Sequence, residues 1–367
     1  MRGVSSTPTV DRIEVRVYRF PTDTPEGDGT IRWKATTMVL VNADAGGARG
    51  LGYTYASRAA GALIVDTLAS VVEGRDAFDL PGAFSAMQAA LRNVGIPGAG
   101  MMALSAVDLA LWDLKARLLG LPIAVLLGRA RKRVPIYGSG GFTTYDLPTL
   151  ERQLRGWVDS GIPRVKMKVG SAPDQDPHRV DAARACIGDR AQLMVDANGA
   201  YSVPQSLELA ESFAERDVKW FEEPVSSEDL VGLAEIRRRV PAGLRVAAGE
   251  YGDTAIAIRK MLEARCVDVL QADATRCGGV TGFLRAASMA HAFSTPFSAH
   301  CAPALHGNLG CSVEAIEHLE YFHDHVRLES LFFDGVPKRR EGWLEPDHAS
   351  PGFGLQLKDS DAEPFQI

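Results

Sequence analysis

The amino-acid sequence predicts two kinds of architecture in one chain, an α+β domain followed by an α/β barrel. The first 130 residues read as strands followed by helices. From residue 134 onward, eight short apolar segments alternate with amphipathic stretches, and nearly every one of the eight ends in a polar or ionisable residue. A chain of 367 residues is long enough to hold both parts.

The first part begins with strand patterns and then turns helical. Its strand candidates are Val10–Phe20, Thr36–Val41 and Gly50–Tyr55. A polar stretch, Pro21–Gly29, follows the first of them and reads as a loop. The clearest helix is Met101–Leu119, because apolar residues recur there at helical spacing and Gly120 stands where a helix commonly ends. We therefore expect an α+β unit over residues 1–130.

The second part reads as a succession of βα units. Its strand candidates are VPIYGSG (134–140), RVKMKVG (164–170), LMVDAN (193–198), WFEEP (220–224), RVAAGE (245–250), VDVLQAD (267–273), PFSAH (296–300) and EHLEYF (317–322). They begin about 21 to 30 residues apart, with helix-like segments between them. Seven or eight such units are typical of a barrel rather than an open sheet. We expect a barrel over 131–335 and a tail, 336–367, that packs back on the first domain.

Composition excludes several classes of function. Lys and Arg number 40 against 46 Asp and Glu, so the net charge of −6 argues against a nucleic-acid or anionic membrane partner. No apolar run approaches the roughly 18 residues that span a bilayer, and the start, MRGVSSTPTV, lacks the apolar core of a signal peptide. The five cysteines contain no CxxC pair. We expect a cytoplasmic protein with free thiols.

Three acids follow three consecutive strands of the predicted barrel. Asp196, Glu222 and Glu250 should lie side by side at its rim, where their charges would repel one another. A hard divalent cation removes that conflict, and an all-oxygen set suits Mg²⁺ or Mn²⁺ better than zinc. The alternative is that each acid pairs with a local arginine or caps a helix.

Bases stand at other strand ends of the same rim. Lys166 and Lys168 share one strand face, where mutual proximity lowers a lysine pKa and makes an amine usable as a base. Asp273 and His300 lie across the barrel, and a carboxylate on one imidazole nitrogen leaves the other for acid–base chemistry. The alternatives are an edge strand rich in lysine and a core histidine. We expect His323–His325 to form a solvated loop.

The order of these strand-end residues resembles the enolase superfamily, specifically its mandelate racemase subgroup. The matching strings are Lys166-Met-Lys168, Val195-Asp-Ala-Asn198, Phe221-Glu-Glu-Pro224, Gly249-Glu250, Asp273 with Cys277-Gly-Gly-Val-Thr-Gly282, Ser298-Ala-His300 and His318-Leu-Glu320. The segment Ala103–Lys115 also resembles the family's helix leading into the barrel. The resemblance covers essentially the whole chain.

The resemblance implies an α+β capping domain on a modified TIM barrel of the (β/α)7β type. It implies that Asp196, Glu222 and Glu250 bind Mg²⁺ and that the substrate is a small carboxylate bearing an α-proton. Lys168, with Lys166 beside it, would be the base on one face of the substrate. The His300–Asp273 pair would serve the opposite face, and Glu320 would donate a hydrogen bond to the developing enolate. A homo-oligomer is also implied.

Formation of an enediolate would be the shared first step, and the next step decides the product. Loss of a β-hydroxyl would dehydrate a sugar acid, an aldonate or aldarate, to a 2-keto-3-deoxy acid. Reprotonation from the other face would make the protein a racemase or epimerase of a 2-hydroxy acid. A catalytically quiet carboxylate-binding protein would not need bases on two faces. A metal-dependent hydrolase would be expected to place histidines near the metal, where all three candidates are carboxylates.

Loops of the cap would choose the substrate. Pro21–Trp33 is polar, which suits a polyhydroxylated acid better than mandelate, although it also reads as a solvent-exposed turn. The expected substrate contacts are Arg32, Tyr53, Tyr55 and Asn198. The sequence therefore favours a magnesium-dependent sugar-acid dehydratase.

Overall fold

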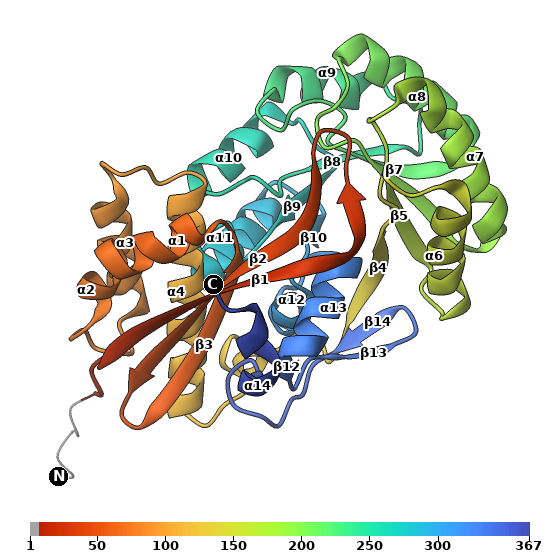
Figure 1. Cartoon of the computed structure of the whole chain (residues 1–367). Helices are drawn as coiled ribbons and strands as arrows, with labels where there is room; N and C mark the ends of the chain where they lie inside the picture. Colours follow the sequence, from red (N-terminus) through yellow and green to blue (C-terminus); the bar gives the residue numbers. More distant parts are fainter. Residues whose placement is uncertain (1–6) are drawn as a thin grey trace.

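The computed structural model describes residues 7–367, and its largest feature is a closed barrel of parallel strands (Figure 1). The strands are β4 (Val134–Gly140), β5 (Arg164–Lys168), β6 (Gln192–Asp196), β7 (Val218–Glu222), β8 (Arg245–Ala248), β9 (Val269–Ala272), β10 (Phe297–Ala299) and β11 (Ile316–Phe322). They pair in chain order, and β11 pairs with β4 to close the barrel. The predicted fold class is confirmed. The first six residues of MRGVSSTPTV lie outside the described residues.

Helices connect the successive barrel strands and cover the outside of the barrel (Figure 1). They are α6 (Leu147–Asp159), α7 (Asp176–Ile187), α8 (Val203–Glu215), α9 (Leu230–Arg239), α10 (Ala255–Ala264), α11 (Gly279–Ala292) and α12 (Pro303–Leu309). Side chains of Asp146, Ser202 and Thr254 accept backbone N–H groups at the starts of α6, α8 and α10. These caps fix where each loop above the strands ends and its helix begins.

The interior of the barrel is filled by side chains. A buried cluster of Tyr137, Met194, Trp220, Ala247 and Val269 packs inside it. Trp220 lies two residues before Glu222, so both side chains point to the same face of β7. The cluster therefore forms an apolar floor beneath the polar strand ends.

The cap combines an antiparallel sheet with helices. The sheet contains β1 (Arg12–Gly27), β2 (Arg32–Ala45) and β3 (Ala48–Tyr55). The helices are α1 (Arg58–Leu63), a π-helical segment (Ile64–Leu68), α2 (Ala69–Val72), α3 (Leu80–Leu91), α4 (Ala99–Leu118) and the short α5 (Ile123–Leu126). In Figure 1 the β1–β2 hairpin extends from this sheet across the barrel.

The hairpin differs from the loop expected over Pro21–Gly29. β1 continues to Gly27, with a register irregularity between Pro21 and Glu26, because β2 supplies pairing partners as far as Arg32. The Asp28 carboxylate then closes the turn by accepting the backbone N–H groups of Thr30 and Ile31. The polar stretch is therefore an ordered arm.

Hydrogen bonds fasten the cap to the barrel. On α4, Trp112 Nε1 donates to Thr281 Oγ1 of α11 over 2.9 Å, and Thr281 Oγ1 donates to Asp108 Oδ2 over 2.7 Å. On β3, Thr54 Oγ1 donates to the Thr275 carbonyl over 2.7 Å. The cap thus has a fixed position over the carboxyl ends of the barrel strands.

The last part of the chain contacts both the barrel and the cap. Its elements are α13 (His323–Phe332), β12 (Phe333–Asp334), β13 (Lys338–Arg340), β14 (Trp343–Glu345), β15 (Gln356–Leu357) and α14 (Asp359–Ala362). β14 pairs antiparallel with the start of β4, whereas Ile367 N donates to the Val17 carbonyl of the cap over 2.9 Å. Within residues 7–367, no helix is both long and apolar enough to cross a bilayer.

Candidate active site

The carboxyl ends of the barrel strands bring the ionisable candidates together under the cap. The buried residues gathered there are Lys166, Lys168, Asp196, Glu222, Glu250, Asp273, His300 and Glu320. A cavity of about 340 Å³ opens above them, and Lys168, Glu250, His300 and Glu320 line it. A cavity of this size accommodates a small organic molecule.

The three acids form a compact group of carboxylates. Asp196, Glu222 and Glu250 each place a ligand atom within 4.8 Å of the others, and all three are buried. Burial and the neighbouring Asp196 raise the pKa of Glu222 to about 8. Oε2 of Glu250 accepts no hydrogen bond, although His300 Nε2 lies 3.2 Å away. An all-carboxylate set with an unpartnered oxygen fits Mg²⁺.

The two lysines of β5 have different surroundings. Lys166 is fully buried, and its Nζ lies 2.5 Å from Glu222 Oε1 and 2.9 Å from Glu320 Oε1. Lys168 faces the cavity, and its Nζ donates to Asp196 Oδ2 over 2.5 Å and to Asn198 Oδ1 over 3.1 Å. Lys168 is therefore the lysine that a substrate can reach.

The charge of Lys168 differs from the sequence-based expectation. Burial and the nearby Lys166 lower its pKa, but the carboxylates of Asp196, Glu250 and Glu320 together outweigh them and hold the pKa above the ordinary range. A cation that neutralises Asp196 would reduce this effect. The expected lowering of the lysine pKa thus requires the metal site to be filled.

His300 is held by Asp273. Nδ1 of His300 lies 2.9 Å from Asp273 Oδ2, while Asp273 Oδ1 accepts hydrogen bonds from Thr275 N and Oγ1, each over 2.8 Å. Burial lowers the pKa of His300, but the carboxylates of Glu250 and Glu320 outweigh it and raise the pKa above 6.5. Nε2 is left facing the acids and the cavity, where it can give or take a proton.

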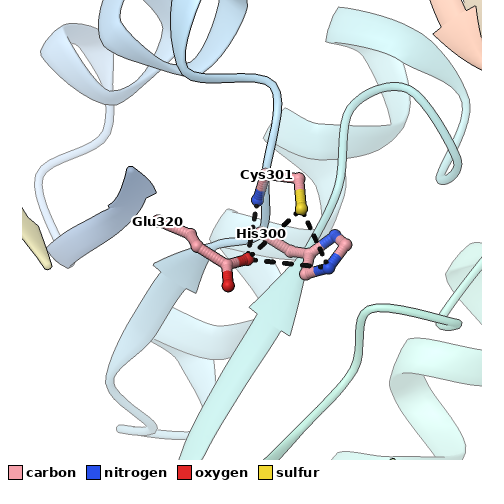
Figure 2. A group of neighbouring side chains, drawn as sticks. All are labelled: His300, Cys301 and Glu320. Atoms are coloured by element: carbon pink, nitrogen blue, oxygen red, sulfur yellow. Dashed lines mark hydrogen bonds and ion pairs between the residues drawn. The ribbon is translucent and has the colours of Figure 1, made fainter. Parts of the chain in front are cut away.

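Glu320 accepts hydrogen bonds from several sides. Ser139 Oγ donates to its Oε1 over 2.5 Å, and Cys301 N donates to its Oε2 over 3.0 Å. Figure 2 shows Cys301 between Glu320 and His300, with Sγ 3.2 Å from His300 Nε2. Burial raises the pKa of Glu320, but Lys166 and His300 outweigh it and hold the pKa well below 4.5. Glu320 is thus an ionised acceptor here, whereas the resemblance implied a donor.

The four expected substrate contacts fall into two groups. Asn198 and Tyr55 line the cavity. Tyr53 does not line it, because its side chain is buried and its hydroxyl donates to Glu329 Oε1 over 2.6 Å. Arg32 is exposed and lies outside the lining, whereas its neighbours Ile31 and Trp33 belong to it. Successive side chains of a strand point to opposite faces, which explains why Arg32 lies outside the lining while the adjacent Trp33 belongs to it.

The interpretation of His323–His325 as a solvated loop is wrong. α13 begins at His323, immediately after β11, and returns His325 to the cavity. His325 is buried and stacks on Tyr55, with ring centroids 3.5 Å apart. Its Nδ1 accepts the backbone N–H of Ala302 over 3.2 Å. The motif is therefore part of the cavity wall.

Several cavity residues were not predicted from the sequence. Arg276 lines the cavity, and its Nη1 lies 3.1 Å from Glu250 Oε1. Cys301 follows His300 directly, and Arg276 follows Asp273 by three residues, so their loop positions after strands were an available indication. Asp28, Thr36 and Thr37 come from the hairpin, and their place depends on how the cap docks.

Two family models match the chain. Residues 12–128 match the N-terminal domain of mandelate racemase and muconate lactonizing enzyme. Residues 149–362 match the enolase C-terminal domain-like family. Together they cover most of the cap and the barrel.

Curated relatives match over most of their length. The 3,6-anhydro-alpha-L-galactonate cycloisomerase of Streptomyces coelicolor is 32% identical over 86% of this chain and 88% of its own. The L-talarate/galactarate dehydratase of Salmonella typhimurium is 30% identical over 96% of this chain and 90% of its own.

Solved structures show the same architecture. A mandelate racemase/muconate lactonizing enzyme-like protein from Rubrobacter xylanophilus is 54% identical, with a TM-score of 0.96 over 98% of this chain and 100% of its own. A racemase from Streptomyces coelicolor with bound magnesium is 29% identical, with a TM-score of 0.92 over 98% and 100%. The chain therefore belongs to the mandelate racemase/muconate lactonizing enzyme family of the enolase superfamily, and it is a magnesium-dependent enzyme.

Proposed function

We propose that the protein dehydrates a sugar acid, an aldonate or aldarate, to a 2-keto-3-deoxy acid. The observation that carries the proposal is the placement of Lys168 and His300. Both line one cavity, Lys168 contacts Asp196, and His300 Nε2 lies 3.2 Å from Glu250. The acid group thus stands between two proton-transferring side chains.

Each group has one task in this scheme. Mg²⁺ bound by Asp196, Glu222 and Glu250 supplies stabilisation of the negative charge that develops on the substrate carboxylate. Lys168, in its neutral form, takes the α-proton from one side. His300, in its protonated form, gives its proton to the β-hydroxyl, the C–O bond breaks, and water leaves. The resulting enol tautomerises to the 2-keto acid, so the step needs no oxidant.

The remaining cavity lining suits a polyhydroxylated substrate. Thr36, Thr37 and Ser57 supply hydroxyl groups, and Asn198 and Arg276 supply an amide and a guanidinium. Such groups can pair with several substrate hydroxyls and with a carboxylate. The name of the Salmonella relative, a talarate/galactarate dehydratase, agrees with this class of substrate.

Racemisation or epimerisation of a 2-hydroxy acid is the second candidate. The same pair of groups favours it, because His300 can return a proton to the α-carbon from the side opposite Lys168. A substrate without a β-hydroxyl leaves only this outcome. The two reactions share their first step and differ in the atom that receives the proton from His300.

A screen of aldonic and aldaric acids for 2-keto acid, with Mg²⁺ present and mandelate as the control, tests the proposal. We expect a 2-keto-3-deoxy acid from at least one sugar acid, and no product from mandelate. An epimer without keto acid would support the second candidate. Absence of both products with folded, magnesium-loaded protein would contradict the proposed chemistry.

We also propose that the chain acts as a homo-oligomer, as the family resemblance implies. Exposed apolar side chains on the cap, Val65 at 60% and Val94 at 58%, supply surface that an interface would cover. Light scattering during size exclusion measures the mass directly, and a monomer at working concentration would contradict the proposal.

A further inference from the structure

A second set of potential metal ligands lies outside the acid group of the barrel rim. Asp23 and Glu26 belong to β1, and His323 is the first residue of α13. The three residues offer one imidazole nitrogen and two carboxylate oxygens, all within 4.8 Å of one another. His323 Nε2 lies 2.9 Å from Asp23 Oδ2. The set therefore joins the hairpin to the helix that follows the last barrel strand.

The carboxyl group of Glu26 lacks one of the hydrogen-bond partners that its burial calls for. The residue is 0% exposed, and Oε2 accepts Trp33 Nε1 over 2.8 Å, but Oε1 has no hydrogen-bond partner. A buried carboxyl oxygen without a partner is unfavourable, because it has lost its hydrogen bonds to water and gained none in return. A cation at the centre of the set would supply that partner.

The neighbouring cation is already engaged. Arg327 donates to Asp324 Oδ1 and to the Pro21 carbonyl, each over 2.7 Å. Asp324 also accepts Thr36 Oγ1 over 2.5 Å. The charge of Arg327 is thus paired with Asp324. Among the described residues, His323 is the only basic side chain that pairs with Asp23, and none pairs with Glu26.

We propose that Asp23, Glu26 and His323 bind a second divalent cation, Zn²⁺, and that this cation fastens the β1–β2 hairpin to α13. Imidazole nitrogen and carboxylate oxygen are both zinc ligands, and the imidazole distinguishes this set from the all-oxygen set of the barrel rim. The side chains of Asp23 and His323 are 44% and 27% exposed, so the ion has a path from solvent and room for a water ligand.

The site would act on the wall of the catalytic cavity. The hairpin carries Asp28 and Trp33 into the cavity lining, and α13 carries His325 into it. A cation between the two elements holds these walls together without touching the reacting groups. This role is independent of the reaction proposed above, so either proposal can fail without the other.

Zinc binding in excess Mg²⁺ tests the site. After equilibrium dialysis and elemental analysis, we expect wild type to hold one more Zn²⁺ per chain than His323→Ala. His178→Ala, which removes an exposed histidine of α7, is the matched control and should bind as wild type does. Glu26→Gln keeps the acceptor for Trp33 and should weaken zinc binding by at least about tenfold, since even outer partners of a metal ligand change affinity by roughly 10–100-fold.

Two outcomes would overturn the site. One is equal zinc content in wild type and a folded His323→Ala or Glu26→Gln variant. The other is loss of zinc in Cys301→Ser alone, which would place the ion on the His300, Cys301 and Glu320 group instead. Hydrogen exchange tests whether the cation fastens the β1–β2 hairpin to α13. Zn²⁺ should slow amide exchange over residues 21–33 in wild type and not in His323→Ala. Unchanged exchange in zinc-loaded wild type would overturn that part.

Discussion

At the scale of single residues, Asp273 and Tyr53 each act on one neighbouring side chain, His300 and Glu329 respectively. Asp273 fixes one ring nitrogen of His300 and is itself held by Thr275. The hydroxyl of Tyr53 donates a buried hydrogen bond to Glu329. Asp273 and Tyr53 do not line the cavity, so each acts through the residue that it contacts. Each role leads to a different measurable effect.

Asp273→Asn should separate chemistry from metal binding. Loss of the charge behind His300 lowers the pKa of that ring, so the activity that needs protonated His300 declines at a lower pH than in wild type. We expect kcat for dehydration to fall by roughly 10²–10⁴-fold, the contribution of a positioned acid or base. Magnesium affinity should stay unchanged. A pH–kcat profile identical to that of wild type would show that Asp273 does not tune His300.

Tyr53→Phe should affect stability rather than substrate affinity. The variant removes the shorter of two hydrogen bonds that Glu329 Oε1 accepts from tyrosines, so the free energy of unfolding should fall by about 1–3 kcal/mol. Urea denaturation measures this loss, and KM should stay near the wild-type value. Tyr55→Phe is the comparison: Tyr55 donates to the same oxygen over 3.3 Å, but it also lines the cavity, so this variant should change KM. A large rise in KM for Tyr53→Phe would restore it as a substrate contact.

At the scale of elements, the barrel strands could be predicted and the outer part of the β1–β2 hairpin could not. Nearly every barrel strand is a short apolar run that ends in a polar residue, so pattern alone places Lys168 or Asp196 at a strand end. Pro21–Gly27 lacks such a pattern, and its pairing depends on a partner strand that begins at Arg32. His325 was missed for a related reason, since only the helix start at His323 returns it to the mouth.

Gly29 tests the position of the hairpin. A Cβ there would lie 2.2 Å from the Ala197 carbonyl oxygen and 2.7 Å from that of Val169, so Gly29→Ala must push the arm away from the barrel. We expect kcat/KM to fall by roughly 100-fold, because a displacement of about 1 Å can have that effect. Gly156→Ala on α6, where a Cβ meets open space, is the control and should leave activity unchanged. Equal activity in both variants would mean that the arm does not shape the site.

At the scale of the whole molecule, buried acids join the cap to the barrel and make stability depend on pH. Burial raises the pKa of Asp108 on α4 to about 7, above the ordinary value of 3.8. The folded state therefore holds this proton more tightly than the unfolded chain, and its stabilisation is lost as the pH rises from about 4 through 7. Asp108→Asn keeps an acceptor for Thr281 but has no titrating group at this position, so its free energy of unfolding does not include this loss.

Urea denaturation in EDTA between pH 5 and 8 measures the effect. The free energy of unfolding of wild type should fall relative to that of Asp108→Asn by on the order of 2–3 kcal/mol across this range. Other titrating groups contribute equally to both proteins and cancel in the difference. A constant difference between the two proteins would contradict a buried, protonated Asp108.

The barrel part of the site could be predicted from the sequence, whereas the cap part depends on how the cap docks on the barrel. The ends of parallel strands meet at one rim, so the sequence alone brought Lys168, Asp196 and His300 to one mouth. The cap residues Trp33 and Thr36 enter the cavity only because the cap lies on the barrel in one orientation. That orientation depends on contacts between distant segments, such as Trp112 with Thr281, which no local pattern encodes.

The division of labour between Lys168 and His300 is the central claim, and solvent deuterium exchange tests it most directly. A sugar acid turned over by wild type is incubated in D₂O with Mg²⁺ and folded, magnesium-loaded variants, and proton NMR follows both the α-proton and the keto product. His300→Asn should still exchange the α-proton while forming no 2-keto acid, and Lys168→Ala should do neither. Full dehydration by His300→Asn, or wild-type exchange by Lys168→Ala, would contradict the account.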